Sequence, residues 1–326
     1  MPQSSIAYAV GRVRAAARKP LGNAQLERLL SSADYDEALR LLIEMGWSDA
    51  QAGDVEQLSI SMLEQICTRL RAITPMSELT DCFLLRHDAQ NLKTLFKARI
   101  LDIKPEGLSR CGTIPLDSLR HAVTERSYKK LPAFLELVME TLEKQMALNP
   151  DPMQIDVQID RALYAELARR MKAVKSKPVK SYFAGKADLI NAVSFLRLTA
   201  IKTQDIQFSD IMLPGGTLSQ QDWQSIAERP EKLVPAFVSY SPQVQRALGN
   251  AQQDHAALPA LEKAADDWLL ALFRPLRNEP FAVEVLIGWL LAHEREAGAV
   301  RLIMAGKLNG FSQGAIRERL REAYGR

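Results

Sequence analysis

A twelve-residue pattern occurs twice in the sequence, and this repeat constrains the fold more than any other feature. HDAQNLKTLFKA begins at residue 87, and ADLINAVSFLRL begins 100 residues later. Both place an aspartate second and an asparagine three residues further on, so that Asp88 corresponds to Asp188 and Asn91 to Asn191. The separation is far longer than the roughly 20–50 residues of solenoid repeats. The repeating unit is therefore about 100 residues long, which is enough to bury a hydrophobic core of its own.

Two shorter segments repeat in the same order. Gly112-Thr113-Ile114 matches Gly216-Thr217-Leu218, and a Pro-Ala-Phe triplet follows at residues 132–134 and again at residues 235–237. Glycine marks a turn in both copies. A long stretch of chain, rather than one isolated motif, is therefore repeated.

A third, degraded copy of the aspartate pattern lies near the end of the sequence, where Glu296 replaces the aspartate and Ala299 replaces the asparagine. Three copies predict three similar small helical domains, the last carrying an appended helix at Ser312–Tyr324. The predicted domains span residues 1–104, 105–207 and 208–326.

Apolar residues recur at spacings of three and four, which is the period of an amphipathic helix. Met62, Ile66 and Leu70 form one such row. Sustained alternation with a period of two is nearly absent. Apolar residues make up 47% of the chain and aromatic residues only 6%, and the apolar residues are mainly leucine and alanine, which favour helices. The predicted fold class is all-α.

The repeated aspartates fall on the apolar side of their helices. Leu85, Asp88, Leu92 and Leu95 follow a spacing of three, four and three, so Asp88 points into the apolar stripe. A carboxylate there must be hydrogen-bonded or paired. It either ties a helix end or a cation within its own domain, or forms a catalytic pair with Asp188. Repetition in separate domains favours the first interpretation, because a catalytic pair must converge on one substrate.

We therefore assign five residues as structural repeat positions. They are Asp88, Asn91, Asp188, Asn191 and Glu296.

Motifs of known enzymes fail on spacing. Asp266-Asp267 lacks the fifth-position acid that an all-helical prenyl-diphosphate synthase needs for its metals, because Leu270 occupies that place. Gly306-Lys307 is similar to the end of a phosphate-binding loop, but Arg301 and Leu308 stand where that loop requires Gly and Ser or Thr. The four histidines are scattered at 87, 121, 255 and 293. No catalytic, cofactor-binding or metal-binding residue is predicted.

The cysteines and the hydropathy indicate a soluble protein. Cys67, Cys82 and Cys111 are odd in number and lack metal-ligand spacing, so we expect buried thiols in a reducing compartment. The longest apolar stretches fall short of the roughly 20 residues that cross a bilayer. The net charge of only +3 gives no general reason to expect a nucleic acid partner.

A basic run with no acid in it lies in the middle of the chain. It consists of Arg169, Arg170, Lys172, Lys175, Lys177 and Lys180. One interpretation is a solvated helix end with the loop at Pro178. The other is a face directed toward anionic lipid headgroups or an acidic protein. No aromatic residues alternate with the cations, which disfavours nucleic acid.

The C-terminal region closely resembles the C/d subunit family of V-type and archaeal-type rotary ATPases. It contains that family's Leu-Leu-x-x-Glu-x-Glu core from Leu290 to Glu296, and Arg-Leu-Ile from Arg301. Gly-Lys-Leu-Asn-Gly follows from Gly306, and Arg-Glu-Arg-Leu from Arg317. This block is the specific part of the resemblance.

The resemblance extends over essentially the whole chain. Its other motifs are an Arg-x-Asp-x-x-Asn-Leu segment that begins at Arg86 and a Tyr-x-x-x-Arg-x-Arg segment that begins at Tyr8. The middle domain matches less distinctly, and the basic run has no family pattern. No catalytic residue is carried over, because this kind of subunit has none.

The resemblance implies a funnel of three similar helical domains around a pseudo-threefold axis. Such a subunit is a non-catalytic part of the central stalk, on the cytoplasmic face of the membrane. It is a socket that couples the central shaft to the proteolipid ring, and so couples ATP hydrolysis or synthesis to proton or sodium transport. It is a monomer when isolated, is present once per complex and needs no cofactor. The choice of ion lies in the ring.

Two rival functions come from other classes. An all-helical enzyme acting on a small ligand would show a deep apolar pocket with converging ionisable groups. A freestanding helical adaptor would not copurify with a rotary ATPase.

Overall fold

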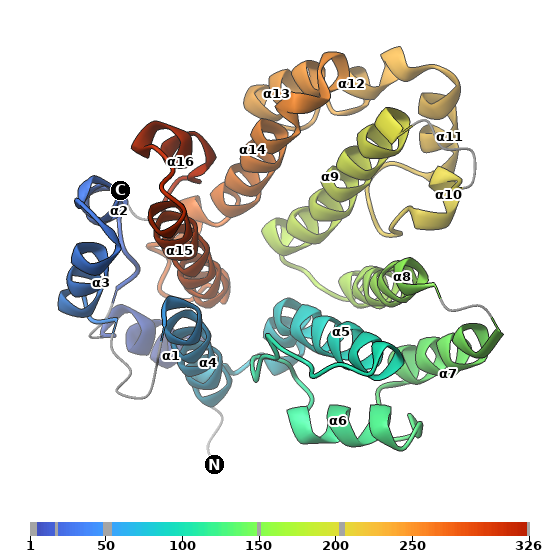
Figure 1. The fold of residues 1–326 in the computed structure, drawn as a ribbon, viewed down its shortest axis with the longest axis horizontal. Coiled ribbons are helices and arrows are strands. Elements are labelled where there is room, and N and C mark those ends of the chain that lie inside the picture. The colour runs from blue at the N-terminus through green and yellow to red at the C-terminus, as the bar shows by residue number, and fades with distance from the viewer. Residues whose placement is uncertain (1–4, 17–18, 48–53, 149–150, 202–205, 325–326) are drawn as a thin grey trace. The chain divides into compact units, whose positions relative to one another are not determined.

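A computed structural model describes residues 5–16, 19–47, 54–148, 151–201 and 206–324, and in these ranges it contains helices and no β-strand (Figure 1). The helical share is 74%, compared with about one third in an average globular protein. The predicted all-α class is confirmed. The chain divides into two compact units: unit 1, Met1–Thr80 with Lys263–Arg326, and unit 2, Asp81–Glu262.

Unit 1 brings the two ends of the sequence into one core. Its α-helices are α1 (Ile6–Arg14), α2 (Asn23–Ser31), α3 (Tyr35–Glu44), α4 (Val55–Ile73), α15 (Glu284–Leu308) and α16 (Gln313–Arg319), and a short 3-10 helix spans Arg274–Leu276. The boundary with unit 2 falls inside α14 (Leu258–Ala271) and inside the first turn of α5 (Ser77–Leu101).

Helix α15 is the centre of unit 1. It packs against α1, α2, α3 and α4, and Figure 1 shows it directly beside α4. Leu286, Ile287 and Ile303 are fully buried and lie on different sides of the helix, as expected for a helix that is apolar all round. Ion pairs from Arg301 to Glu56 and from Arg317 to Glu27, each 2.9 Å long, also join the C-terminal part to the N-terminal part.

Unit 2 holds the remaining helices. They are α5, α6 (Leu116–Thr124), α7 (Ala133–Leu148), α8 (Pro152–Met171), α9 (Lys177–Ile201), α10 (Phe208–Ile211), α11 (Gln220–Glu228), α12 (Leu233–Ala236) and α13 (Pro242–Gln253), with 3-10 turns at Pro230–Lys232 and His255–Ala257.

Helix α8 contacts both 25-residue helices of unit 2, α5 and α9. It packs against α9 and also against α7. Lys93 of α5 pairs with Asp160 of α8 at 2.6 Å, and the ring of Phe83 lies 4.7 Å from that of Phe183. Several helices begin at a capping side chain: Asp151 accepts from the amide of Met153 at the beginning of α8.

Three helices, α5, α9 and α15, have the same length of 25 residues. Asp88 and Asp188 both lie eleven residues after the first residue of their helix, and Glu296 lies twelve residues after it. The predicted three-domain division stays a prediction. The appended helix is shorter than predicted, because α16 covers only Gln313–Arg319 and the chain from Leu320 is no longer helical.

Candidate functional site

The carboxylate of Asp88 is completely buried and binds the turn that leads into α6. Its Oδ2 accepts hydrogen bonds from the amide of Thr113 at 2.7 Å and from the Thr113 hydroxyl at 2.8 Å. Its Oδ1 accepts from the amide of Ile114 at 3.0 Å. Burial raises the pKa of the Asp88 carboxyl, and these three hydrogen bonds oppose that rise.

Asp188 makes the same contacts with the turn that leads into α11. It accepts from the amide and the hydroxyl of Thr217 and from the amide of Leu218, the two amides at 2.8 and 3.2 Å. The hydroxyl of Tyr240, 2.7 Å away, is a fourth donor to this carboxylate. Burial, and then the charge of Asp188, raise the pKa of Tyr240.

A glycine in each turn makes the close approach possible. A β-carbon on Gly112 would lie 2.1 Å from Oδ1 of Asp88, and one on Gly216 would lie 2.1 Å from Oδ1 of Asp188. Neither distance is tolerable for a real side chain. The repeated Gly-Thr pair is therefore explained: the glycine admits the carboxylate, and the threonine supplies two of its donors.

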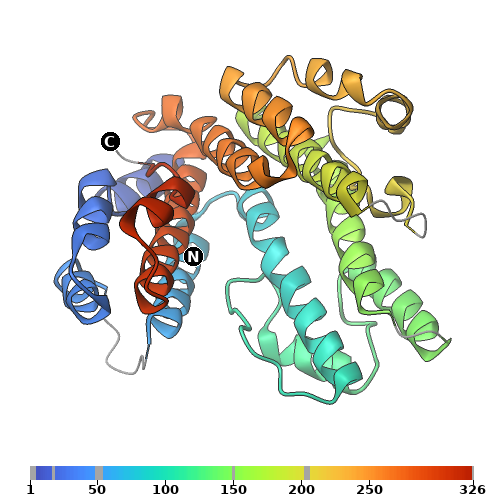
Figure 2. The ribbon, with the colours of Figure 1, turned by 45° about the horizontal axis from the view of Figure 1, so that its top comes forward.

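Asn91 and Asn191 lie about one helical turn after the two aspartates. They bind the chain just before the same glycine-marked turns. The side-chain amide of Asn91 donates to the carbonyl of Ser109 at 2.7 Å and accepts from the Ser109 amide at 2.9 Å. Asn191 does the same with Leu213, at 2.9 and 2.8 Å. Figure 2 shows the chain after α5 running back beside that helix, which is the path these bonds hold.

Glu296 occupies the corresponding part of α15, but its partners differ. Its Oε1 accepts from the indole nitrogen of Trp47 at 2.9 Å, and its Oε2 lies 3.0 Å from Nδ1 of His293. Trp47 precedes Glu296 by 249 residues, so the carboxylate of the last long helix is bound by the N-terminal part of the chain. All three side chains are buried.

The predicted burial and hydrogen bonding of Asp88 and Asp188 are confirmed. Their partners, however, lie beyond residues 104 and 207, so the predicted domain boundaries separate groups that hydrogen bonds join. Because both carboxylates are fully enclosed, they cannot contact a substrate in this conformation. The arrangement fastens a helix to a turn, which is a structural task.

The aspartates of the incomplete prenyl-diphosphate synthase motif form ion pairs within unit 1. Asp267 pairs with Arg295 at 2.7 Å, and Asp266 pairs with Arg321 at 3.0 Å. Burial raises the pKa of Asp267, and the positive charge of Arg295 opposes this rise.

Lys307, the residue of the incomplete phosphate-loop pattern, binds the end of α2. Its ammonium donates to the carbonyl of Leu30 at 3.1 Å and to that of Ser32 at 2.6 Å. A cation at a helix C-terminus stabilises the exposed carbonyls there. Burial lowers the pKa of this lysine.

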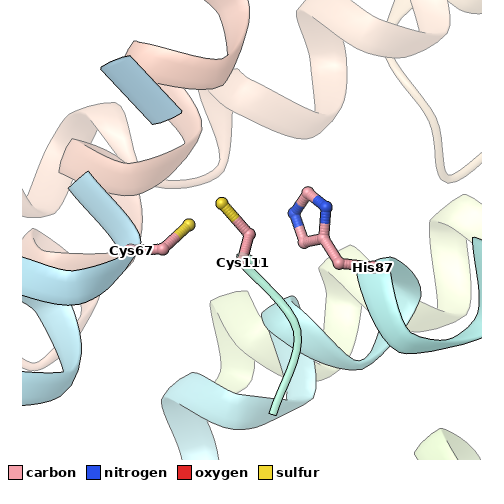
Figure 3. Close-up of side chains that lie close together, drawn as sticks. All are labelled: Cys67, His87 and Cys111. Atoms are coloured by element: carbon pink, nitrogen blue, oxygen red, sulfur yellow. The ribbon is translucent and has the colours of Figure 1, made fainter. Parts of the chain in front are cut away.

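Two possible metal ligands approach each other inside unit 2. His87 of α5 and Cys111 of the following segment offer ligand atoms within 4.8 Å of one another, and Figure 3 shows both side chains. Cys67, also labelled there, belongs to unit 1. A histidine and a cysteine are two ligands fewer than a structural zinc site needs. All three cysteines are buried and form no disulfide.

The basic run divides into residues with different surroundings. Arg169 and Arg170 both bind Glu166 at 2.7 Å. Lys172 and Lys180 line a hollow of about 240 Å³ between α8 and α9. This hollow adjoins a larger one of about 350 Å³, which lies among α5, α8 and α9. The sequence shows the basic run but does not show the hollow. No local pattern reveals that a hollow lies between α8 and α9.

Comparison with known proteins assigns the chain to a family. The family model described as ATP synthase (C/AC39) subunit matches residues 9–319. The chain belongs to this family, which confirms the resemblance inferred from the C-terminal motifs. Among the described residues, no helix has the length and apolar character that crossing a bilayer requires.

Several curated relatives match most of the chain. It is 23% identical to the C subunit of the A-type ATP synthase of Methanosarcina mazei, covering 97% of this chain and 93% of the relative. It is 23% identical to the C subunit of the V-type sodium ATPase of Enterococcus hirae, covering 78% of each. It is 25% identical to the C subunit of the A-type ATP synthase of Halorubrum lacusprofundi, covering 92% of this chain and 89% of the relative.

Proposed function

We propose that this chain is the non-catalytic C subunit of an A/V-type rotary ATPase, in which it couples the central shaft to the proteolipid ring. The observation that carries the proposal is the family match over residues 9–319, together with relatives named as C subunits of A-type and V-type ATPases. The protein transmits torque between ATP hydrolysis or synthesis and ion movement. The reaction itself takes place in other subunits.

A coupling part must be stiff, because a flexible one stores rotation as deformation. The hydrogen bonds of the buried carboxylates Asp88, Asp188 and Glu296 support this role. Asp88 and Asp188 fasten 25-residue helices to the turns that precede α6 and α11, and Glu296 fastens the third such helix to Trp47. All three carboxylates are buried, which limits competition from water for these hydrogen bonds. Torque then passes through rigid helices instead of loops.

We further propose the arrangement that the family resemblance implies. Three similar helical domains surround a pseudo-threefold axis and form a funnel whose polar socket receives the shaft. The protein is peripheral, sits on the cytoplasmic face and is present once per complex. The symmetry of the ring need not match three, so we expect the three domains to make unequal contacts with it.

Copurification from native membranes tests the proposal. An affinity-tagged chain is expressed in its own host, and the detergent-solubilised complex is captured and separated by size. We expect shaft and ring subunits to elute with it at one copy of this chain per complex. Elution as a monomer, with the ATPase intact in the flow-through, would instead indicate a freestanding adaptor.

A second experiment tests the absence of catalysis directly. Calorimetry with the purified chain and ATP is expected to give no heat of binding at micromolar concentrations, because Lys307 is bound to two backbone carbonyls. Saturable binding that Lys307→Ala abolishes would refute this part of the proposal.

A further inference from the structure

The two adjoining hollows of unit 2 form one elongated recess along α8. They share Tyr164, Leu167 and Phe183, which are between 4% and 8% exposed and form an apolar floor. The recess extends from Asp160 to Lys172, a distance of about 18 Å along a helix. It is therefore long enough for about three turns of another helix.

The borders of the recess are strongly basic. Among the described residues, five lysine and arginine side chains line it and a single carboxylate, Asp160, accompanies them. The cations are Arg86, Lys93, Lys172, Lys180 and Lys186. Asp160 is paired with Lys93, so the lining still carries more cations than carboxylates. A positive border around an apolar floor selects an occupant with carboxylates on one side and apolar side chains on the other.

We propose that this recess binds an acidic amphipathic helix of another protein. The shape favours a helix over a membrane, because the recess between two helices admits individual side chains, whereas a flat bilayer would contact the whole basic run. An apolar face would enter between α8 and α9, and carboxylates at the edges would meet the lysines. Such binding does not depend on the proposed rotary function.

The basic run supplies its own matched control. Lys172 and Lys180 line the recess, whereas Lys175 and Lys177 belong to the same run and are exposed but do not line it. Reversing either pair changes the net charge equally. Only the first pair changes the charge of the recess.

The probe is a fluorescein-labelled synthetic helix of about 14 residues, with leucine on one face and glutamate on the other. Binding to the purified full chain is followed by fluorescence anisotropy. Lys172→Glu with Lys180→Glu should weaken binding about ten-fold or more. Lys175→Glu with Lys177→Glu should change it less than about two-fold. Thermal melts of both variants verify that the fold is intact.

A second variant tests the apolar part without altering charge. Ala184 lines the smaller hollow, and Ala184→Trp should fill it and reduce binding by a similar factor. Vesicles of phosphatidylcholine with phosphatidylserine are measured in parallel.

Three results would overturn the proposal. The first is no binding of the acidic helix to the wild-type chain. The second is equal weakening by the two lysine pairs, which would show general attraction to the basic run. The third is tighter association with the vesicles than with the helix.

Discussion

Asp88 and Asp188 both bind a glycine-marked turn, but they accept hydrogen bonds from different numbers of donors. Each carboxylate accepts two amides and a threonine hydroxyl from a glycine-marked turn, but Asp188 also accepts the hydroxyl of Tyr240. The additional donor comes from a residue 52 positions further along the chain. The hydrogen bonds between the aspartate and its turn are therefore repeated, while the contact with a more distant residue is made only by Asp188.

The glycine of the turn should be the most sensitive position. In Gly216→Ala the new methyl group would meet Oδ1 of Asp188, so the turn and the carboxylate must separate. We expect a loss of about 3–5 kcal/mol in the free energy of unfolding, from overpacking together with stranded polar groups. Urea denaturation followed by circular dichroism measures it. Gly298→Ala, where nothing lies within 4 Å of an added β-carbon, is the control.

Removing the carboxylates should cost less, and unequally. Asp188→Ala leaves four donors without an acceptor and should cost about 2–4 kcal/mol, whereas Asp88→Ala leaves three and should cost about 1–3 kcal/mol. The same denaturation experiment compares the two variants. A larger loss from Asp88→Ala would contradict the donor count. The two losses should be nearly additive in the double variant, because the sites share no partner.

Tyr240→Phe should reduce the difference between the sites. It removes only the fourth donor and should cost about 1 kcal/mol. In that background, Asp188→Ala should cost about as much as Asp88→Ala does in the wild type. A double-mutant cycle of Tyr240 and Asp188 measures their coupling, and a coupling energy of zero would show that this hydrogen bond does not contribute to stability.

The smallest expected effect is a dependence on pH at Asp88. Burial raises the pKa of its carboxyl in the folded protein above the ordinary value of 3.8. The folded state then holds the proton more tightly than the unfolded state. The stability due to this group is therefore greatest below the unfolded pKa and falls as the pH rises through the folded one.

Comparison with Asp88→Asn isolates this effect, because the variant cannot titrate there. Melting temperatures of both proteins are measured from acidic to neutral pH. Relative to the variant, the wild type should lose stability as the pH rises. The opposite trend would mean that the hydrogen bonds outweigh burial and lower this pKa.

The sequence predicted the parts of this structure that depend on local pattern. The three- and four-residue spacing predicted an all-α fold, and the position of Asp88 in an apolar stripe predicted a buried, hydrogen-bonded carboxylate. The matching Gly-Thr pairs were visible too, but nothing in the local pattern connected Thr113 to a side chain 25 residues earlier.

Partners that come from distant segments could not be predicted. Tyr240 and Trp47 reach their carboxylates only through the packing of whole helices. The predicted domain boundaries stay a prediction. Repeats show where a pattern recurs, but they do not show that a hydrogen bond joins Asp88 to Thr113 across residue 104. The basic recess also depends on how α8 meets α9, which no run of charges reveals.

We claim that the repeated aspartates stabilise the fold of this protein and do not bind its partner subunits. The most direct test measures thermal melting of the purified chain and capture of ATPase subunits by the same protein. The proteins are the wild type, Asp88→Ala and the exposed α7 control Glu140→Ala. Capture is performed well below the melting temperature of each. We expect Asp88→Ala to lower the melting temperature by several degrees, to capture the same subunits and to differ from the control only in stability. An unchanged melting temperature with loss of capture would contradict this claim.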